Sequence, residues 1–566
     1  PSAWTESQWA WAVEGAVCAN SATTSRAKVL AHVDLATALM PDAERERITA
    51  EVLGDAFARS HPSHDRGMKD GGHQFASRSV LQMENQLTAM FVDGRGVIDR
   101  TLRDEAIGSV ADRFADRSGF RLNDEQIRAV YAMGQSPNVI TLVSGVAGSG
   151  KTSVLSVLND ALGRGRKSLL VASTANIAAA KAGHESGAPW MNLRQLALKL
   201  QDPDVSPTLF DVVVIDEASL ADVRSIHVVA EHCVKHDRQM ILMGDHRQLK
   251  AVGAGEIYNV LCAKHPESVI RLERNQRQQT ESGRLVADAL HARQFTRAWD
   301  VLHDEARIVV VRGAAEKVSA VAAMVVDHMA EHGAGEVTCD AITNAEVDAI
   351  NIRVDEHLVG TGAVESASVR EFRQRGRSLA VGVGTVLRVV EPTGPRTPAA
   401  ERLHRSQRAT VVATAGAKVQ LRLGDGTARA VTPAALLRHF AHGYAGTVHK
   451  VQGQTSAIHV SALSPMKDAA SMYVSASRAR LGVYFVADAT DFLSDVELTR
   501  TRTWGRAQFD DAVIDRIESV FLGRTETVDS AAASMQPKVP APAYSSHTYG
   551  AAGYSAPRSQ GMGMSW

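Results

Sequence analysis

A glycine-rich loop near residue 150 has the residue pattern of a phosphate-binding site. Residues 145–152 read GVAGSGKT and follow the apolar run 139–143, which predicts a buried strand before the loop and a helix after it. In such a loop the glycines let backbone N–H groups turn toward phosphates, and the helix N-terminus adds partial positive charge. Lys151 is expected to reach the terminal phosphates, and Thr152 to ligate Mg²⁺. The pattern predicts a nucleoside triphosphate site formed by Gly145, Gly148, Ser149, Gly150, Lys151, Thr152 and Ser153.

Two adjacent acids follow a second apolar run. Residues 209–215 are largely apolar and β-branched, and Asp216 and Glu217 come directly after them. In a parallel nucleotide-binding sheet this strand end is expected at the carboxyl edge. There Asp216 would hold Mg²⁺, and Glu217 would orient and deprotonate an attacking water. Taken alone, an acid pair at a strand end is more often a helix cap or a turn, but after a phosphate-binding loop it predicts hydrolysis.

A third apolar run, residues 240–243, ends in the polar segment 244–249 (GDHRQL). If the strands are parallel and their crossovers right-handed, this segment lies on the same sheet edge as the loop. Gln248 is then expected to hydrogen-bond a γ-phosphate or the water that attacks it.

These segments belong to a longer ordered set. From about residue 120 to about residue 490, the chain resembles superfamily 1 DNA helicases of the 5′-to-3′ branch, which includes RecD-like and TraI-like enzymes. Residues 75–94 also resemble the stretch that precedes the helicase lobe in TraI-like conjugative relaxases. The further segments that carry the resemblance are 122–126 (LNDEQ), 170–176 (LVASTAN), 272–278 (LERNQRQ), 444–455 (YAGTVHKVQGQT) and 473–480 (YVSASRAR).

The resemblance implies further roles at the nucleotide. Gln126 is expected to read adenine, Arg277 to bind the γ-phosphate, and Arg478 to act as an arginine finger; Gly453 joins the nucleotide-binding set. If Arg478 and Lys151 lie on different lobes, hydrolysis requires the lobes to close. The alternative for each arginine is a surface salt bridge, which contributes little to stability. The implied catalytic set is Lys151, Glu217, Gln248, Arg277 and Arg478, with Thr152 and Asp216 as the metal ligands.

The resemblance also implies contacts with DNA. Ser173, Thr174 and Asn176 are expected to touch the strand from the first lobe, and Thr447 and His449 from the second. Hydroxyl groups are good donors to phosphate oxygens. Taken alone, the His449–Lys450 pair would more often be a solvated turn, and the polar run around it can contact DNA, nucleotide, or both.

Three segments depart from the family pattern. Residues 187–194 lack the Thr-x-His pair of many relatives, and His246, Arg247 and Lys250 stand in a segment where proline is often found. Residues 475–477 read Ser-Ala-Ser instead of the commoner Ala-Leu-Thr. These departures affect the expected DNA contacts and leave the hydrolytic set intact.

The resemblance and the strand–helix pattern together predict an α/β fold with two RecA-like doubly wound lobes. A helical N-terminal domain is expected over 1–115, the first lobe over 116–271 and the second over 272–524. Short alternating runs and the hairpin signal Asp425-Gly426 predict a small SH3-like β insertion over about 360–437 in the second lobe.

The end of the chain, residues 525–566, is rich in Ser, Ala, Pro and Gly. It is expected to be a disordered tail because it cannot bury enough apolar area. Base stacking or partner binding by its tyrosines is the alternative.

The bulk composition is that of a globular protein of several domains. The chain has 566 residues, 45% hydrophobic and 22% charged, with a net charge of −1 that argues against a histone-like binder. The four cysteines are scattered without CxxC spacing, so neither a zinc site nor a disulfide framework is indicated. No membrane insertion and a cytoplasmic location are expected, and the start at Pro1 suggests a processed or excised chain.

The functional expectation is an ATP- and Mg²⁺-dependent translocase that moves 5′-to-3′ on single-stranded DNA and unwinds duplex forks. The expected setting is conjugative DNA transfer, with relaxosome or secretion-system proteins as candidate partners. The alternatives are a RecD-like repair helicase and an NTP-dependent, single-stranded-DNA-binding scaffold that does not unwind.

Overall fold

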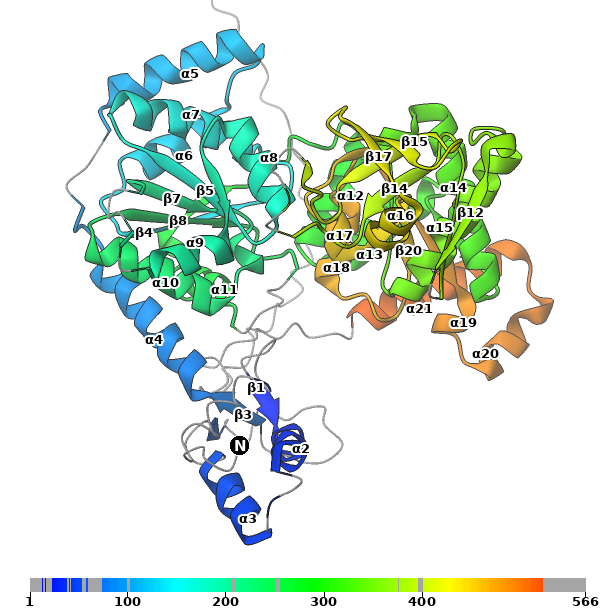
Figure 1. Ribbon diagram of the computed structural model, residues 1–566, viewed down its shortest axis with the longest axis horizontal. Coiled ribbons are helices and arrows are strands. Elements are labelled where there is room, and N and C mark those ends of the chain that lie inside the picture. The colour runs from blue at the N-terminus through cyan, green and yellow to red at the C-terminus, as the bar shows by residue number, and fades with distance from the viewer. Residues whose placement is uncertain are drawn as a thin grey trace, which may run out of the picture.

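The computed structural model describes residues 13, 16, 23–37, 40, 42–52, 57–59, 74–98 and 102–522, apart from gaps at 203, 206–208, 250–254, 375, 395–396 and 398–400. Two lobes, each built on a parallel sheet, stand side by side (Figure 1). A smaller N-terminal part lies below the first lobe and is joined to it by a long helix (Figure 1).

The first lobe contains a six-stranded sheet in the order β6-β5-β7-β8-β4-β9, and every pair in it is parallel. Successive side chains of a strand point to opposite faces, so a strand that is apolar at every position is covered on both faces. The strands predicted before the glycine loop, before Asp216 and before the 244–249 segment are thereby confirmed. The strands are β4 (Ile140–Gly145), β5 (Leu169–Ser173), β6 (Trp190–Asn192), β7 (Val212–Ile215), β8 (Gln239–Gly244) and β9 (Val269–Leu272).

Helices cover both faces of this sheet. Ile140 and Leu142 of β4 pack in one apolar cluster with helices α4, α9, α10 and α11, whereas Val143 packs in a second cluster with α5, α6, α7 and α8. The result is the doubly wound arrangement that the sequence predicts, but α4 and most of α5, which fall within the predicted N-terminal domain (1–115), pack on the sheet of this lobe. The helices are α4 (Arg78–Asp93), α5 (Asp104–Ser118), α6 (Asp124–Gly134), α7 (Lys151–Arg164), α8 (Asn176–Ser186), α9 (Leu193–Leu200), α10 (Val223–Lys235) and α11 (Ile257–Lys264).

The second lobe repeats this plan with a parallel sheet in the order β10-β21-β20-β11-β19. Helices α12, α13, α18 and α21 cover one face, and α14 and α15 the other. The strands are β10 (Ile308–Val311), β11 (Val337–Ala341), β19 (Ala445–Thr447), β20 (Ser456–Leu463) and β21 (Ala479–Asp488). The helices are α12 (Glu281–His291), α13 (Phe295–Asp304), α14 (Ala314–His332), α15 (Asn344–Gly360), α17 (Val448–Val451), α18 (Ala469–Ala476), α19 (Ala489–Phe492), α20 (Asp495–Arg500) and α21 (Arg506–Leu522).

A β insertion, residues 370–442, separates α15 from β19. It contains an antiparallel sheet in the order β17-β16-β15-β14-β18 and a separate hairpin of β12 and β13, which share one apolar core. Asp425-Gly426 lies in the turn between β16 and β17, as the hairpin signal predicts, whereas a closed SH3-like barrel stays a prediction. The elements are β12 (Arg370–Gln374), β13 (Arg377–Val381), β14 (Val386–Val389), β15 (Arg408–Ala413), β16 (Val419–Leu423), β17 (Ala428–Val431), α16 (Pro433–His439) and β18 (Phe440–His442).

The described part of the N-terminal region contains helices and also a three-stranded antiparallel sheet, which the sequence analysis does not predict. The predicted tail, 525–566, lies outside the described residues. Within the described ranges, no helix is long and apolar enough to span a membrane. The N-terminal elements are β1 (Thr23–Ser25), α2 (Arg26–Thr37), α3 (Asp42–Glu51), β2 (Phe57–Arg59) and β3 (Gln74–Ser77).

Candidate nucleotide-binding cleft between the lobes

The glycine-rich loop has a backbone that its glycines make possible. Strand β4 ends at Gly145 and helix α7 begins at Lys151. Gly148 and Gly150 have φ angles of +81° and +80°, which strain any residue with a Cβ atom. Space is also lacking, because a Cβ at Gly148 would lie 2.4 Å from Cβ of Arg277. The loop therefore holds its backbone N–H groups in a fixed, closely packed turn.

Lys151 bends back over this loop. Its Nζ donates hydrogen bonds to the carbonyl oxygens of Gly145, at 2.7 Å, and Val146, at 3.3 Å. The buried hydroxyl of Ser149 has no hydrogen-bond partner among the described residues. An ammonium group and an unsatisfied hydroxyl at the turn suit a phosphate group, which would offer acceptors to both.

Two acids lie at the carboxyl end of β7, across from the loop. Oδ1 of Asp216 and Oε2 of Glu217 are buried without hydrogen-bond partners in the described part of the chain. Burial and the neighbouring Glu217 raise the pKa of Asp216 to about 6, and Lys151 opposes this shift. Glu217 has a φ of +53°, a strained backbone conformation for a glutamate. Unsatisfied carboxylate oxygens at this place fit a hydrated Mg²⁺ next to a triphosphate.

Residues of both lobes line one open cleft with a volume of about 350 Å³. Lys151, Asp216 and Glu217 come from the first lobe, and Gly453 and Arg478 from the second. The residues predicted for nucleotide binding and hydrolysis are thus brought together, with Gln126 and Gly145 as the exceptions. The lining residues are Ala147, Gly148, Ser149, Gly150, Lys151, Thr152, Ser153, Ala178, Lys181, Ala182, Glu185, Asp216, Glu217, Gln248, Gln276, Arg277, Gly453 and Arg478.

Arg478 is 2% exposed and reaches the cleft from the end of α18. Its Nε donates to the carbonyl of Val474 at 3.1 Å, and a terminal nitrogen donates to the carbonyl of Gln454 at 3.4 Å. Burial lowers the pKa of Arg478, and Glu217 opposes this shift. These contacts hold a buried positive charge in the wall of the cleft.

Arg277 stands between the loop and the second lobe. Its guanidinium donates to the carbonyl of Ser477 at 2.8 Å, and the neighbouring Gln276 donates its backbone N–H to the carbonyl of Gly148 at 2.8 Å. Burial, together with Arg478, lowers the pKa of Arg277 to about 10. Two arginines crowded into one cleft are stabilised when an anion binds between them.

Gln248 connects the lobes at the carboxyl end of β8. Its Oε1 accepts a hydrogen bond from Nε2 of Gln452 at 3.1 Å, and its own Nε2 donates to Asp245 at 3.2 Å. Gln452 belongs to the 444–455 segment, so the phosphate-sensing candidate touches the predicted DNA-contacting segment directly.

Tyr473 and Asp245 make a second inter-lobe contact, to which the sequence analysis assigns no role. The Tyr473 hydroxyl donates to Oδ2 of Asp245 and accepts from the backbone N–H of Ala147, both at 2.9 Å. Burial alone would raise the pKa of Asp245, but His291 and Lys151 outweigh it and hold the pKa well below its usual range. In the sequence, the pair is marked only by its location: Asp245 lies in the segment 244–249 and Tyr473 in the segment 473–480.

Gln126 lies behind the loop and does not line the cleft. Its Nε2 donates to the carbonyl of Ser149 at 2.8 Å, and its Oε1 accepts from the N–H of Asn123 at 2.9 Å. Both ends of the amide are used within the protein, so adenine reading by Gln126 stays a prediction.

Of the residues expected at DNA, Ser173 is misplaced for that role in this structure. It is fully buried at the end of β5, on the strand face that it shares with Val171, which packs beneath helices. A phosphate cannot reach its hydroxyl in this arrangement. The other candidates are at least partly exposed: Thr174, Asn176, Thr447 and His449.

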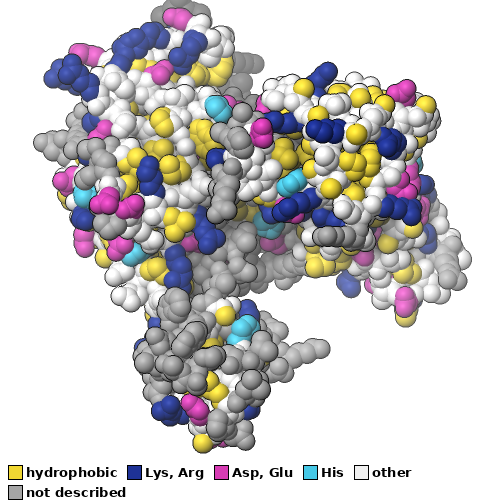
Figure 2. Space-filling model, in the orientation of Figure 1, with side chains coloured by type: hydrophobic (Ala, Val, Ile, Leu, Met, Phe, Trp, Pro, Cys, Tyr) yellow, Lys and Arg dark blue, Asp and Glu magenta, His cyan; other side chains and the backbone are white. Residues whose placement is uncertain are grey.

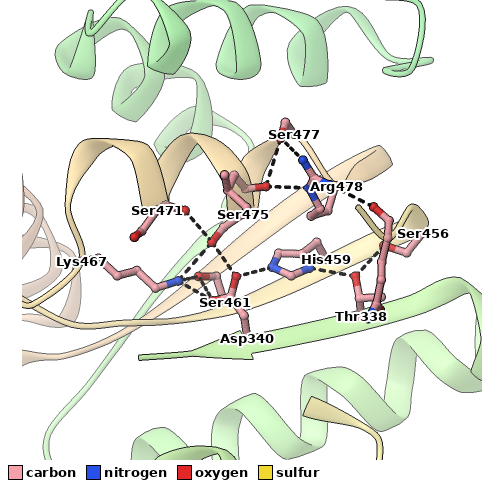
Figure 3. Close-up of polar contacts among 12 residues, drawn as sticks. Thr338, Asp340, Ser456, His459, Ser461, Lys467, Ser471, Ser475, Ser477 and Arg478 are labelled. Atoms are coloured by element: carbon pink, nitrogen blue, oxygen red, sulfur yellow. Dashed lines mark hydrogen bonds and ion pairs between the residues drawn. The ribbon is translucent and has the colours of Figure 1, made fainter. Parts of the chain in front are cut away.

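A buried polar network underlies the helix that carries Tyr473 and leads to Arg478 (Figure 3). Asp340 of β11 pairs with Lys467 and accepts hydrogen bonds from His459, at 2.8 Å, and from Ser475, at 2.5 Å. Asp340, Lys467 and His459 are fully buried. Burial alone would raise the pKa of Asp340, but Lys467 and His459 hold it well below its usual range. The network fixes α18 to the sheet at Ser475, one of the positions that depart from the family pattern.

Comparisons with known proteins show what this chain is similar to. Residues 121–313 match the AAA domain family. The probable conjugal transfer protein TraA of Sinorhizobium fredii is 23% identical over 425 residues, which cover 73% of this chain and 36% of that protein. The conjugal transfer protein TraA of Rhizobium radiobacter is 24% identical over 397 residues, which cover 68% of this chain and 33% of that protein. The chain thus spans about a third of the length of these relatives.

Among solved structures, the chain is similar to Pif1 helicase from Bacteroides in complex with ADP-AlF3 and single-stranded DNA. The match has 16% identity and a TM-score of 0.42 and covers 69% of this chain and 98% of that one. Together with the segments named in the sequence analysis, the matches to the AAA domain family and to the two TraA proteins support a resemblance to superfamily 1 DNA helicases of the 5′-to-3′ branch. Within that branch the chain resembles the helicase part of conjugative relaxases.

Proposed function

We propose that this chain is an ATP-dependent translocase that moves 5′-to-3′ on single-stranded DNA and unwinds duplex DNA as the motor of conjugative transfer. One observation carries the proposal: Arg478 of the second lobe lines the same cleft as Lys151 and Glu217 of the first lobe. A cleft completed by two lobes couples phosphate chemistry to lobe movement.

The hydrolytic step follows from the charges in the cleft. Lys151 and the loop N–H groups bind the phosphates, and Glu217 orients the attacking water and takes its proton. Arg277 and Arg478 stabilise the charge that develops on the transferred phosphoryl group. Thr152 and Asp216 would hold Mg²⁺, which supplies charge neutralisation at the phosphate oxygens.

Movement along DNA follows from the contacts between the lobes. Loss of the γ-phosphate removes the anion that Arg277 and Arg478 share, so the two lobes are held together less strongly. Gln248 and Gln452 pass this change to the segment that carries Thr447 and His449. With Thr174 and Asn176 on the first lobe, a strand gripped on both sides advances as the lobes close and open.

The proposed role in conjugative DNA transfer rests on the two TraA relatives. Both are described as conjugal transfer proteins, and this chain matches about a third of each. Relaxosome and secretion-system proteins are the partners that such a setting supplies. A RecD-like role in repair is the alternative, and it predicts the same cleft chemistry.

The decisive experiment measures phosphate release with and without a single-stranded oligonucleotide. Wild-type protein is expected to be stimulated by the strand, and Lys151→Ala to lose turnover while still binding DNA. The matched control is Lys264→Ala, at an exposed lysine at the end of α11, which should behave as wild type. If added DNA leaves phosphate release unchanged in wild type, the protein is a binding scaffold and the motor proposal fails.

Direction is tested separately, on duplexes that carry either a 5′ or a 3′ single-stranded tail. Displacement is expected on the 5′-tailed substrate. A preference for the 3′ tail would refute the direction while leaving the hydrolytic assignment in place.

A further inference from the structure

A second pocket lies where the β insertion meets the sheet of the second lobe. Arg388 of β14 is 8% exposed and lines it. Its Nε is buried without a hydrogen-bond partner, and no carboxylate of the described residues lies within ion-pair distance of its guanidinium. A buried guanidinium without a partner is costly, so an unsatisfied arginine at a pocket calls for an explanation.

Two more cations face the same pocket. Arg408 of β15 donates to the carbonyl of Gly443 at 3.2 Å, and Lys450 of α17 donates to Oδ1 of Asn344 at 2.9 Å. The space inside this pocket is narrow, about 20 Å³, compared with about 350 Å³ in the nucleotide cleft. The residues that line this Arg388 pocket are Thr338, Cys339, Arg388, Ser406, Arg408, Gly443, Tyr444, Ala445, Gly446, Lys450, Val451 and Gln454.

One acid, Asp348, acts on the Arg388 pocket: it opposes the pKa shifts of Arg388 and Lys450, but within the described residues it forms no ion pair with either. Burial lowers the pKa of Arg388, with Asp348 opposing the shift, and burial also lowers the pKa of Arg408. The pKa of Lys450 is lowered by burial and by Arg388. Burial or mutual repulsion disfavours the charged form of each of these three side chains. An anionic ligand in the pocket would stabilise the charged forms.

The neighbourhood of the pocket indicates which anion it takes. Lys450 lies on the short helix that also carries His449, which is exposed, and Thr447 directly precedes this helix. On the face drawn in Figure 2, Lys and Arg side chains gather over the part of the second lobe where Figure 1 places β14, β17 and α17. Thr447 and His449 are sequence neighbours of Gly446 and Lys450, which line the pocket, so a strand bound at Thr447 and His449 would lie close to it.

We propose that the Arg388 pocket binds one backbone phosphate of single-stranded DNA, held jointly by Arg388 and Arg408 of the insertion and Lys450 of the second lobe. The inference rests on the proposed function and adds to it a specific contact for the strand. A guanidinium donates in a planar fork that matches two phosphate oxygens, and an ammonium adds a third donor. The shared phosphate would make the insertion and the second lobe grip the strand as one body.

The first test measures the affinity for a fluorescent oligothymidine by anisotropy over a range of NaCl concentrations. Arg388→Met keeps the apolar volume and removes the charge, and it is expected to weaken binding about tenfold at low salt. Each lost phosphate contact on a single strand lowers the slope of log K against log salt by about 0.7. Arg388→Lys should retain the wild-type slope, and Arg353→Met is the matched control because Arg353 is exposed and paired with Glu356 at 3.0 Å.

The second test locates the phosphate. A single uncharged methylphosphonate is moved along the oligonucleotide, and one position is expected to weaken binding to the wild type but not to Arg388→Met. Lys450→Met should lose sensitivity at the same position, and the double variant should lose less than the sum of the two. If the two variants respond to different positions, or if Arg388→Met binds with wild-type affinity and slope, the pocket does not hold the strand.

Inorganic phosphate, compared with chloride at equal ionic strength, separates a strand contact from a site for the free ion. One outcome would overturn the assignment to DNA: inorganic phosphate stabilises the wild type but not Arg388→Met, while the two proteins bind the oligonucleotide equally well. Failure of the wild type to bind the oligonucleotide at all would instead remove the proposed function. Because Arg388 has no partner to lose, the melting temperature of Arg388→Met should equal or exceed that of the wild type.

Discussion

The hydroxyl of Tyr473 in the second lobe bridges two parts of the first lobe, donating to Asp245 and accepting from the backbone N–H of Ala147, both at 2.9 Å. Ala147 belongs to the phosphate-binding loop, and Asp245 directly follows β8 and also holds Gln248. One hydroxyl therefore connects the loop, the phosphate-sensing candidate and the helix that leads to Arg478.

Replacing Tyr473 with phenylalanine removes this bridge and leaves the ring packed. Hydrogen bonds to charged groups contribute about 1.5–3 kcal/mol, so misalignment of the lobes should lower DNA-stimulated turnover roughly tenfold or more. The KM for ATP should change less, because the loop itself is retained. The measurement is steady-state phosphate release, with Tyr484→Phe on β21 as the control; equal losses in the two variants would contradict a specific role for Tyr473.

Arg478→Ala should remove a charge that the transition state needs while leaving the first lobe intact. Arginine fingers contribute about 10³–10⁵ in kcat in phosphoryl transfer. We expect kcat to fall by about 10³ with nucleotide binding largely retained, as measured by phosphate release and by titration with a fluorescent ATP analogue. Glu217→Gln should likewise leave bound ATP unhydrolysed, so ATP rather than ADP is expected to be recovered from both variants. Wild-type turnover in Arg478→Ala would exclude the inter-lobe mechanism.

The network of Asp340, Lys467 and His459 predicts strong non-additivity. Lys467→Met leaves the buried Asp340 carboxylate without its main partner, which should destabilise the second lobe by about 3–5 kcal/mol. Adding Asp340→Asn removes the stranded charge, so the double variant should regain much of this stability. Urea unfolding of the wild type, the two single variants and the double variant measures the coupling free energy between Lys467 and Asp340. If the losses in the free energy of unfolding simply add, the two residues act independently.

The same set of Lys467 and Asp340 variants tests whether the network positions α18, when their phosphate release is measured together with their stability. Ser475 joins the network to α18, so loosening the network should lower turnover even at temperatures where every variant is folded. Rescue of turnover by the double variant would show that the unpaired charge, rather than the lost contact to α18, causes the defect.

Patterns that are local in the sequence predict three strands of the first lobe and its part of the cleft, whereas the second lobe, Arg277 and Arg478 are predicted by the family resemblance. Strands β4, β7 and β8 are continuous apolar runs, and parallel pairing forces the residues at their carboxyl ends onto one edge. For this reason the sequence alone assigns Lys151, Asp216 and Gln248 to one cleft.

Contacts that depend on the relative position of distant segments cannot be predicted in this way. Tyr473 lies 228 residues from Asp245, and no periodicity connects them. Lys467 is 127 residues from the Asp340 carboxylate that it neutralises. Ser173 is a case in which a local prediction does not match the structure. Its residue type suggests a phosphate contact, but the alternation of side chains along β5 places it on a face that helices cover. Side-chain direction and lobe placement decide these cases, and both are tertiary properties.

His246 predicts a pH dependence of stability. It lies in the segment after β8, its Nδ1 is 3.0 Å from the Ser144 hydroxyl, and burial lowers its pKa to about 4, with Asp245 opposing the shift. The unfolded chain takes up a proton near pH 6.5, whereas the folded protein does so only near pH 4. Stability from this group is therefore complete above pH 6.5 and falls as the pH drops toward 4, with a limiting slope of about 1.4 kcal/mol per pH unit.

His246→Gln removes the titrating group and keeps a polar side chain next to Ser144. We expect its free energy of unfolding to fall less steeply than that of wild type between pH 7 and pH 5, as measured by urea unfolding at closely spaced pH values. His184→Gln, at an exposed histidine of α8, is the matched control. Equal slopes in wild type and His246→Gln would show that His246 takes up its proton as readily in the folded protein as in the unfolded chain, which is incompatible with a neutral, partly buried ring against Ser144.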